Sequence, residues 1–521
     1  KSSIPSIDFS KCRDYRLEMH HSYCHSGKRV IRAWGLLFAI LLICLAKPYR
    51  IEASLNDIPG HIILKLQHPY SIADISHLQR TIYSWHEQQY TTPNYPTITP
   101  IQESFRPGET DQSHYLSLVY SNNVDLSDMI PFLENQHDVV YAERNRRLGQ
   151  KEASQETDMG ENVFILETEY AWVKYLPKNN HDVIVAILDT GVNVEHVSFT
   201  FWKNPGEIPN DGIDNDGNGL VDDIVGWDFS GVDSDIEEIG DNDVDDQNGH
   251  GSLVAGIAAM KPLYRYNVAG VNPGAPIMAL KVFYDDRILG SDLDLAQATR
   301  YAVDMAAAEG KRVVLNMSFG GGSTLFREAV SYAIEQGAIV VTSAGNTDTL
   351  LRPTYFDNVI AVGNMEKSKE LGRSNYFGPE VDFIAYGTLV EGASKNGVNN
   401  ASVDSGTSMA SPMIAGLISR LLQFDKTLTL PEIMSLLESH AVQINGGSPT
   451  TTGHGYIDVE SLVKSYGVTV QKKYVDVELD EDIATLEFDL VYHNGDLQQK
   501  FMQYIYTKDG RKQSLHRELG E

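Results

Sequence analysis

The sequence predicts an α/β fold in which a doubly wound, mostly parallel sheet carries helices on both faces. From about residue 180 onward, short apolar runs alternate with longer segments of helical periodicity. The apolar runs are nearly continuous, as expected for parallel strands that are buried on both faces. In open sheets of this kind, functional residues gather at the carboxyl ends of the strands.

Five strands and four helices are expected in this part of the chain. The helices would each follow a strand or a Gly-rich turn, which is the order of a doubly wound sheet. The predicted strands are His181–Leu188, Arg312–Met317, Ala338–Ser343, Asn358–Gly363 and Val381–Ala385, and the predicted helices are Ser252–Ala259, Asp292–Gly310, Leu325–Gln336 and Ser408–Phe424.

A smaller α+β domain is predicted to precede this sheet. Its strands would be His61–Leu66, Tyr115–Tyr120 and Val139–Glu143, and its helices Ile75–Gln89 and Leu126–Asn135. The polar stretch 144–158 has no periodicity and is expected to be an exposed linker. The domain and its linker therefore occupy residues 54–157, and the large α/β domain occupies 158–466. Residues 467–521 form a β-rich extension, and it stays open whether the extension continues beyond the given sequence.

Residues 1–53 form an upstream segment that contains a predicted secretory signal from Met19. A basic flank precedes the apolar run Gly35–Ala46, and Ile51–Ala53 is a weak cleavage site. A membrane anchor is the alternative, but twelve apolar residues are fewer than the roughly 17–25 that span a bilayer. We therefore expect the secretory pathway or the extracellular space, and leave membrane association open.

Charge and cysteine usage exclude several classes of function. The formal net charge of −29 argues against nucleic acid as a partner and favours cations such as calcium. All three cysteines, Cys12, Cys24 and Cys44, precede residue 50. The folded body therefore cannot contain a catalytic thiol, a redox disulfide or a thiolate zinc site.

The clearest chemical signal is the stretch Asp404–Pro412. Gly406 and Thr407 precede Ser408, and an apolar periodic segment follows, so Ser408 is predicted to lie at a helix N-terminus. The free N–H groups and the positive dipole end there suit an oxyanion that forms beside an attacking serine. A serine nucleophile needs a base, so the rest of the chain has to supply one.

Three further residues could complete such a site. Asp189 ends an apolar strand, His250 stands between glycines before a predicted helix, and Asn346 follows another buried strand. Each has an ordinary alternative role, as a turn former, a surface or core histidine, and a turn cap respectively. The four residues together are a much stronger signal than any one of them.

These motifs resemble those of the subtilisin-like serine proteases. The resemblance rests on Asp189-Thr190-Gly191, His250-Gly251, Ser343–Asn346 and Gly406–Pro412, and it extends over about residues 160–466, with 54–157 similar to the family's inhibitory propeptide. Asp-Thr-Gly, and Met-Ala-Ser-Pro after the serine, are typical of the subtilisin branch rather than the kexin branch. The fold implied is the one predicted above.

The resemblance also implies roles for individual residues. Ser408 would be the nucleophile, His250 the general base, Asp189 the group that orients the base, and Asn346 an oxyanion donor, as in the mechanism known for subtilisin. Substrate would bind along the strand edge and pocket formed by Ser318, Phe319, Gly320, Ala344 and Gly345. A core strand followed by a Gly-rich turn is the plain alternative for the first three.

A structural calcium site is predicted in the loop Asp214–Asp223. Its oxygen-bearing residues have the spacing of an EF-hand loop, although the final bidentate Glu is replaced by Val225. The expected ligands are Asp214, Asp216, Asn218, the carbonyl of Leu220, and Asp222. A solvated acidic turn is the alternative, and it is also the reading we favour for the acidic run Asp233–Asp246.

The function that these observations favour is a secreted serine endopeptidase, made as a zymogen that processes itself. Its partners would be protein or peptide substrates and its own propeptide, which would end near Val139–Glu143 and be cut between Arg144 and Asp158; we expect a monomer. The alternative is a catalytically silent, protease-like binding or adhesion protein. A selective maturation protease remains a third possibility, since the triad does not determine specificity.

Overall fold

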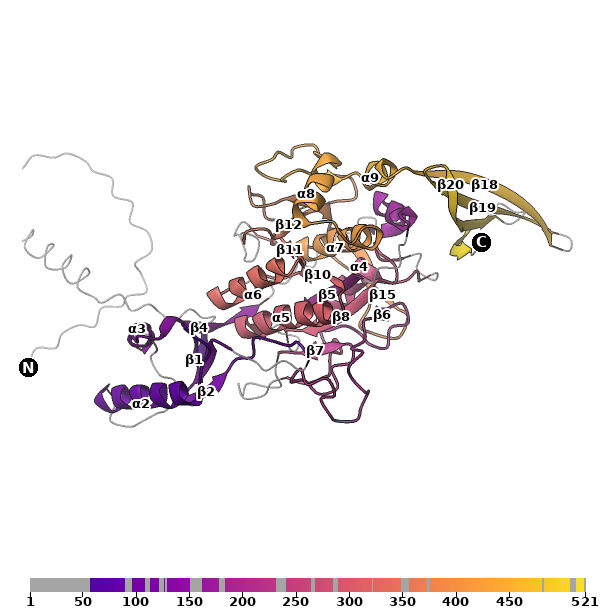
Figure 1. Ribbon diagram of the computed structural model, residues 1–521. Helices are drawn as coiled ribbons and strands as arrows, with labels where there is room; N and C mark the ends of the chain where they lie inside the picture. The colour runs from indigo at the N-terminus through magenta and orange to yellow at the C-terminus, as the bar shows by residue number, and fades with distance from the viewer. Residues whose placement is uncertain are drawn as a thin grey trace, which may run out of the picture. The chain divides into compact units, whose positions relative to one another are not determined.

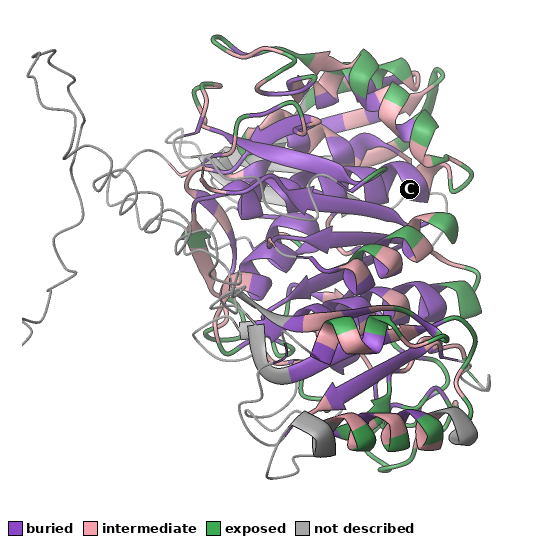
Figure 2. Ribbon diagram, turned by 90° about the vertical axis from the view of Figure 1, so that its left-hand side faces the viewer, coloured by how far each residue is buried: buried purple, intermediate pink, exposed green. Residues whose placement is uncertain are grey.

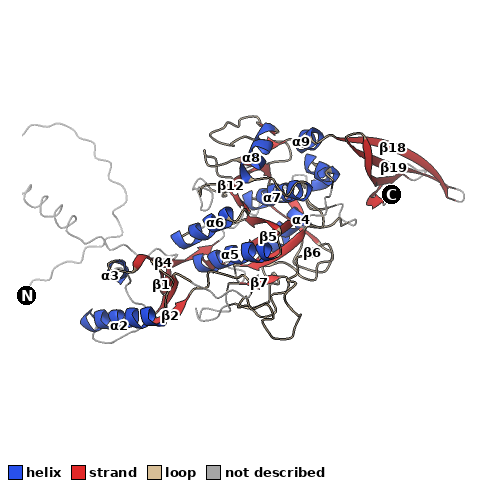
Figure 3. Cartoon of the chain, viewed as in Figure 1, coloured by secondary structure: helices blue, strands red, loops and turns tan. Residues whose placement is uncertain are grey.

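The structure is a computed structural model in which helices and strands alternate along most of the chain (Figure 3). It describes residues 57–519 apart from 90–95, 108–112, 121–125, 127–128, 150–161, 178–182, 231–239, 264–267, 284–288, 321, 348–355, 373–374, 480–481 and 507–511. The predicted signal segment therefore lies outside the described residues. No helix among the described residues has both the length and the apolar character needed to cross a membrane.

The large domain contains the predicted strands and helices, with small shifts at their ends (Figure 1). Its main strands are β5 (Val183–Asp189), β8 (Pro276–Lys281), β10 (Arg312–Met317), β11 (Ile339–Ser343), β12 (Ile360–Met365) and β13 (Phe383–Tyr386). Its helices are α4 (His250–Ala259), α5 (Asp292–Ala308), α6 (Thr324–Glu335), α7 (Thr407–Phe424), α8 (Leu430–Ser439) and α9 (Val459–Ser465).

Shorter elements complete the domain. They are the 3-10 helices η2 (Ile165–Glu167) and η3 (Glu169–Tyr175), and the strands β6 (Thr200–Phe201), β7 (Gly226–Asp228), β9 (Leu289–Ser291), β14 (Val390–Ala393), β15 (Ala401–Asp404), β16 (Ala441–Val442) and β17 (Tyr456–Ile457). Sequence reasoning missed β8, although its residues after Pro276 are buried, and it also missed β9.

The main sheet separates two hydrophobic cores, and its strands are buried (Figure 2). Val183, Val185 and Ile187 of β5 pack in the core that includes α4 and α7. Ile184, Ala186 and Leu188 pack in the core that includes α5 and α6. Successive side chains of a strand point to opposite faces, so this uninterrupted apolar strand supplies both cores.

The order of the strands fixes where a site can form. The sheet runs β16-β17-β13-β12-β11-β10-β5-β8-β6, with β7 also paired to β8. β5 is parallel to β10 on one side and to β8 on the other, so the chain reverses its direction of winding beside β5. This switch point lies at the carboxyl ends of β5 and β10, where α/β sheets bind their ligands. The predicted α/β class is confirmed.

The smaller domain is a sheet with helices α2 (Ile72–Gln89) and α3 (Met129–Glu134). Its strands are β1 (Asp57–Leu66), β2 (Thr97–Pro100), β3 (Tyr115–Val119) and β4 (Val139–Gly149), in the order β2-β3-β1-β4. The prediction of a linker from Arg144 was wrong for residues 144–149, because β4 continues through them. They stay extended because they pair with β1 and then with β9 of the large domain.

Residues beyond the large domain form an antiparallel sheet of β18 (Val468–Leu479), β19 (Asp482–His493), β20 (Asp496–Tyr506) and β21 (Lys512–Leu519). Val468 and Val491 are buried in the same core as α7 and α9. The hydroxyl of Tyr175 in η3 donates a hydrogen bond to Asp489 of β19. The first strands of this sheet are thus packed on the large domain.

Candidate active site

Asp189 and His250 meet where β5 ends and α4 begins. His250 Nδ1 lies 2.7 Å from Asp189 Oδ1, and the Asp189 side chain is fully buried while that of His250 is 12 % exposed. The next residue has to be glycine for this approach, because a Cβ at Gly251 would lie 2.1 Å from the carbonyl oxygen of Gly191. The buried carboxylate thus fixes the ring and leaves Nε2 as the nitrogen able to act as a base.

The surroundings of His250 favour its charged form. Burial alone would lower the pKa of the imidazole, but the charge and hydrogen bond of Asp189 outweigh burial, with further contributions from Asp404 and Asp246. The pKa of His250 is therefore raised above its ordinary value of 6.5. This environment stabilises the imidazolium that forms when a base takes a proton from serine.

Asp246 holds the start of α4 and was not identified from the sequence. Its Oδ1 accepts hydrogen bonds from the Thr190 hydroxyl (2.9 Å) and the Gly249 N–H (2.7 Å). Its Oδ2 accepts from the Ser252 N–H (2.8 Å) and hydroxyl (2.6 Å). Only 4 % of Asp246 is exposed, so the prediction that the Asp233–Asp246 run is a solvated loop was wrong at this residue. Residues 231–239 of the run lie outside the described residues.

The signal for Asp246 was present in the sequence as an acidic side chain just ahead of the helix that His250 starts. Acidic residues favour helix N-termini, because they accept hydrogen bonds from free backbone N–H groups. Burial raises the pKa of Asp246, although the hydrogen bonds from Ser252, Gly249 and Thr190 oppose that rise. Asp246 is thus a positioning residue that joins the end of β5 to α4.

Ser408 is the second residue of α7, as the sequence predicts. The serine is 8 % exposed, and its hydroxyl donates a hydrogen bond of 3.1 Å to the carbonyl oxygen of Ser318, just beyond β10. Gly406 precedes the helix with φ of 150°, a conformation that L side chains rarely adopt. The sharp turn presents Ser408 at the positive end of a long helix, which suits an oxyanion.

Asn346 lies beyond β11, next to this turn. Its Oδ1 accepts hydrogen bonds from the N–H (2.8 Å) and hydroxyl (2.9 Å) of Thr407. Because these hydrogen bonds hold Oδ1, the Nδ2 group is the part of the amide that can donate. Nδ2 lies close to Gly406, since a Cβ built on that glycine would be 3.1 Å from it. A donor is thereby placed beside the turn that carries Ser408.

The predicted substrate-binding residues lie at the ends of β10 and β11. Ser318 is buried, and its hydroxyl donates to the Ser408 carbonyl (2.9 Å), while Phe319 packs in the core with its ring 5.2 Å from that of Phe283. Gly320 follows directly. The N–H of Ala344 bonds to Val362 and that of Gly345 to the Thr407 hydroxyl. Ser318–Gly320 thus lie at the switch point, and Ala344 and Gly345 lie at the carboxyl end of the next strand.

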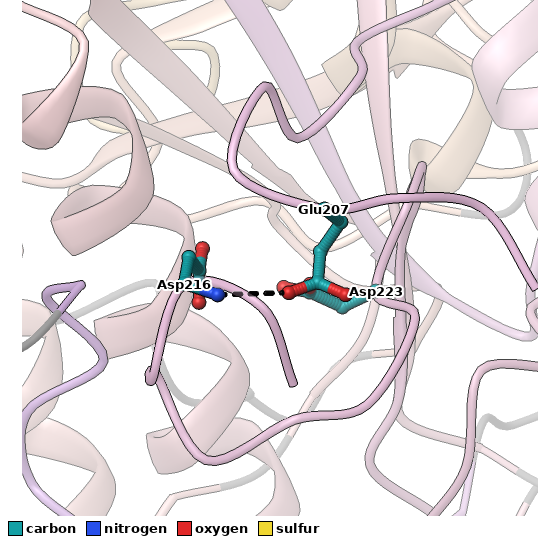
Figure 4. A group of neighbouring side chains, drawn as sticks. All are labelled: Glu207, Asp216 and Asp223. Carbon is teal, nitrogen blue, oxygen red and sulfur yellow. Dashed lines mark hydrogen bonds between the residues drawn. The ribbon is translucent and has the colours of Figure 1, made fainter. Parts of the chain in front are cut away.

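Three acidic side chains gather in the loop after β6, as Figure 4 shows. One oxygen from each of Glu207, Asp216 and Asp223 lies within 4.8 Å of the others. Glu207 Oε1 accepts a hydrogen bond from the Asp216 N–H at 3.2 Å. Burial raises the pKa of Asp216, and it raises that of Asp223 to about 7. Carboxylates grouped and buried in this way are what a hard cation binds.

This cluster shares only Asp216 with the predicted ligands. Asp214 accepts the N–H groups of Gly217 and Gly219, and Asp222 accepts those of Asp211 and Gly212. Asn218 turns its amide NH2 toward Asp216 and Asp223, and Leu220 is buried in the core. These side chains shape the loop, whereas Glu207 and Asp223, outside the EF-hand spacing, supply the remaining acidic oxygens.

A buried Asp–His pair, a serine at a helix N-terminus and an amide beside it form a candidate serine-nucleophile site on a parallel α/β sheet. A sequence model described as the Subtilase family matches residues 180–467, which is more than half of the 521 residues. The chain therefore belongs to the subtilase family.

Two curated relatives agree with this assignment. The thermophilic serine proteinase of Bacillus sp. (strain AK1) is 33 % identical over 283 residues, which cover 54 % of this chain and 61 % of the relative. Thermitase of Thermoactinomyces vulgaris is 32 % identical over 268 residues, covering 50 % and 82 %. The solved structure of Sphericase is 26 % identical with a TM-score of 0.45, covering 55 % of this chain and 96 % of that one.

Proposed function

We propose that this chain is a secreted, self-processing zymogen of a serine endopeptidase. The observation that supports it most is the 2.7 Å contact between Asp189 and His250 at the carboxyl end of β5, with Ser408 in the first turn of α7. His250 Nε2 takes the proton of the Ser408 hydroxyl as the oxygen attacks the peptide carbonyl. Asn346 Nδ2 and the Ser408 N–H stabilise the oxyanion, and His250 then protonates the leaving amine.

The same residues then hydrolyse the acyl-enzyme that results, with water in place of Ser408 as the nucleophile and Ser408 as the leaving group. A water molecule gives its proton to His250 and attacks the ester, and the proton returns to Ser408 as the acid product leaves. Asp189 stays ionised and stabilises the imidazolium in both halves. The substrate backbone would pair with the strand edge at Ser318–Gly320, with Ala344 and Gly345 beside the residue before the cut.

The propeptide role of the small domain is supported by where β4 ends. Arg147, Leu148 and Gly149 pair antiparallel with Ser291, Gly290 and Leu289 of β9. A Cβ on Gly290 would lie 2.1 Å from the Val282 carbonyl oxygen, and the Val282 N–H bonds to the Asp189 carbonyl oxygen at 2.9 Å. The end of β4 is thus connected through β9 and Val282 to the end of β5, and it has the extended form of a bound peptide.

Two glutamates secure the same domain on helix α6. Glu143 of β4 accepts the N–H groups of Thr324 (3.2 Å) and Leu325 (3.0 Å), which are unpaired in the first turn of an isolated helix. Glu328 of α6 accepts from Lys65 (2.7 Å) and Tyr141 (3.1 Å). Such contacts let a cleaved propeptide remain as an inhibitor.

The end of β4 supports a narrower position for the proposed cut. Residues up to Gly149 pair with β9 and lie on the side that would precede the scissile bond. We therefore propose that self-cleavage occurs after Gly149, within Gln150–Asp158, rather than anywhere from Arg144. The mature enzyme would begin in that stretch.

We also propose that the Glu207, Asp216 and Asp223 cluster binds calcium. The residues fit such an ion, because Glu207 and Asp223 are buried and all three offer carboxylate oxygens. A bound cation would neutralise carboxylates that otherwise repel one another. It would stabilise the loop after β6 and take no part in the reaction.

Secretion is part of the proposal because a basic flank precedes the apolar run Gly35–Ala46. Protein or peptide substrates follow from the family. The enzyme would act in the secretory pathway or outside the cell, as a monomer.

Labelling with a fluorophosphonate tests the proposed function most simply. This reagent reacts with a serine that a neighbouring base activates, so the wild-type chain should be labelled once the propeptide is removed. Ser408→Ala should not be labelled, and Ser411→Ala, which changes a buried serine one turn further along α7, should keep the label. A folded wild-type chain that stays unlabelled would favour the protease-like binding protein instead.

A further inference from the structure

One segment of the small domain inserts a side chain into the core of the large domain. Residues 101–106 follow β2 and cross α5, and Phe105 is only 1 % exposed. Its ring lies 5.6 Å from that of Tyr301 and 6.0 Å from that of Phe229, both edge-on. Phe105 therefore fills a pocket whose walls belong to the large domain, together with Trp202 and Leu220.

A buried aspartate of α5 recognises the backbone and the side chain beside Phe105. Asp304 Oδ2 accepts the Phe105 N–H at 2.9 Å, and Asp304 Oδ1 lies 3.3 Å from Arg106 Nε. The Asp304 side chain is 1 % exposed with the small domain in place. Arg106 also donates to the Tyr332 hydroxyl and to Gln336 Oε1, each at 3.2 Å.

These contacts lie near the C-terminal end of α5, away from β9. Asp304 is thirteen residues after Ser291, where β9 ends and pairs with β4. At about 1.5 Å per residue of helix, it lies about 20 Å further along α5. We call the pocket formed by Trp202, Phe229, Tyr301, Asp304 and Tyr332 the Phe–Arg socket.

We propose that the Phe–Arg socket is a second recognition site of the mature enzyme, which binds a protein substrate through an aromatic residue followed by arginine. This inference rests on the proposed function, since the socket is vacated only when the propeptide leaves. Its departure takes the Phe105 N–H and the Arg106 guanidinium away from Asp304 and opens an apolar pocket to water. A substrate chain can replace the backbone N–H, the guanidinium and the aromatic ring in the pocket. It would then gain the binding energy of these three contacts.

The chemistry of the socket selects for this pair of residues. Aromatic and arginine side chains dominate binding energy at protein interfaces when they enter desolvated pockets. Here the carboxylate faces both a backbone N–H and a guanidinium, so the aromatic residue and the arginine have to be consecutive and in this order. Lysine in place of arginine would be a poorer fit, because it lacks the planar fork of donors.

The test measures binding of a fluorescent peptide to enzyme that has processed itself and released its propeptide. The peptide is Ile-Gln-Glu-Ser-Phe-Arg-Pro, which is the sequence of residues 101–107. Blocking Ser408 with a fluorophosphonate beforehand prevents digestion of the peptide and proves that the enzyme is folded. Anisotropy should report saturable binding, weakened about 30-fold or more by Phe→Ala in the peptide and about tenfold by Arg→Gln.

Variants of the enzyme provide the matching control. Asp304→Asn should weaken peptide binding at least tenfold, whereas Glu335→Gln, which removes an exposed charge from α6, should not change it. The peptide substitutions keep the proposal testable if Asp304→Asn does not fold. If the labelled enzyme bound the Phe→Ala peptide as well as the unchanged peptide, or bound neither peptide, the proposed recognition role of the socket would be wrong. The proposed function would remain intact.

Turnover separates the socket from the cleft. In unblocked enzyme, the peptide at saturating concentration should slow at least threefold the cleavage of a protein substrate that contains a Phe-Arg pair. It should leave the hydrolysis of a short chromogenic peptide unchanged. Equal slowing of both substrates would place the peptide in the cleft and overturn the proposal. A chain that neither processes itself nor takes the label would overturn the proposed function and this inference with it.

Discussion

At the scale of single residues, His250 links structure to pH dependence. Asp189 is buried against the ring and raises its pKa above 6.5 despite the opposing effect of burial. Because the base has to be neutral, the charged form that Asp189 favours is the inactive one. Activity should therefore rise with increasing pH through a midpoint above 6.5.

The pH profile of kcat/KM on a peptide substrate tests this expectation. Asp189→Asn should move the acidic limb to lower pH and lower kcat by about 10⁴-fold, since the wrong tautomer is then favoured. A wild-type rate that stays constant down to about pH 4 would contradict the assignment of His250 as the base.

Asp246 should matter for catalysis although it does not touch the substrate. Replacing it by asparagine removes a charge that raises the pKa of His250 and weakens the five hydrogen bonds that Asp246 accepts around the start of α4 and the end of β5. We expect Asp246→Asn to lower kcat about 10-fold or more with little change in KM, and to shift the acidic limb downward. Asp243→Asn, an exposed neighbour, is the control; equal effects of both variants would show a merely general role of charge.

The four candidate catalytic residues could be named from the sequence alone, because each stands beside a recognisable strand or turn, and their catalytic role stays a prediction. Asp246 escaped prediction because we interpreted it as part of a solvated acidic run, although its place just ahead of the helix that His250 starts was a local signal. Glu207 and Asp223 escaped for a different reason: they lie outside the regular spacing of Asp214–Asp222, and only the folded loop brings them to Asp216.

At the scale of elements, the strands that pattern reasoning found are the long apolar ones. Strand β9 has three residues, Leu289–Ser291, and exists because β4 pairs with it. The polar residues 144–149 likewise extend because a partner strand supplies their hydrogen bonds. Pairing between segments that are distant in sequence leaves no local periodicity, so the most informative contact between the two domains was invisible in the sequence.

The acidic loop after β6 should respond to calcium in a pH-dependent way. The folded-state pKa of Asp223 is raised from 3.8 to about 7, so without metal the folded state holds an extra proton in that window. The free energy of unfolding should then fall as pH rises from about 4 to about 7, unless calcium neutralises the cluster. Calcium at about 100 times its Kd adds about 2.7 kcal/mol.

Thermal unfolding with calcium and with chelator measures this effect. We expect calcium to raise Tm by several degrees at pH 8 and by much less at pH 5, where protons compete for Asp223. Asp223→Asn should abolish the response, while Asp211→Asn, an exposed residue of the same loop, should retain it. The same calcium response in wild type and Asp223→Asn would contradict binding at this cluster.

At the scale of the whole molecule, the small domain packs on the large domain within one compact unit. The small domain has its own core around Ile62, Leu64 and Leu116. A separate apolar cluster joins the domains, with Ile63 and Tyr115 on one side and Ala296, Leu325 and Ala329 on the other. With a core of its own, the small domain would leave intact as the proposed propeptide once the chain is cut and Phe105 is withdrawn from the core of the large domain.

Mass spectrometry of the secreted product, with wild type and Ser408→Ala compared, tests self-processing most directly. A self-processing zymogen predicts that the wild-type chain is cut after Gly149, within Gln150–Asp158, and that Ser408→Ala, prepared in a protease-free system, stays whole. Identical cleavage in the variant would contradict self-processing. A folded wild-type chain that remains uncut in the presence of calcium would contradict the zymogen itself.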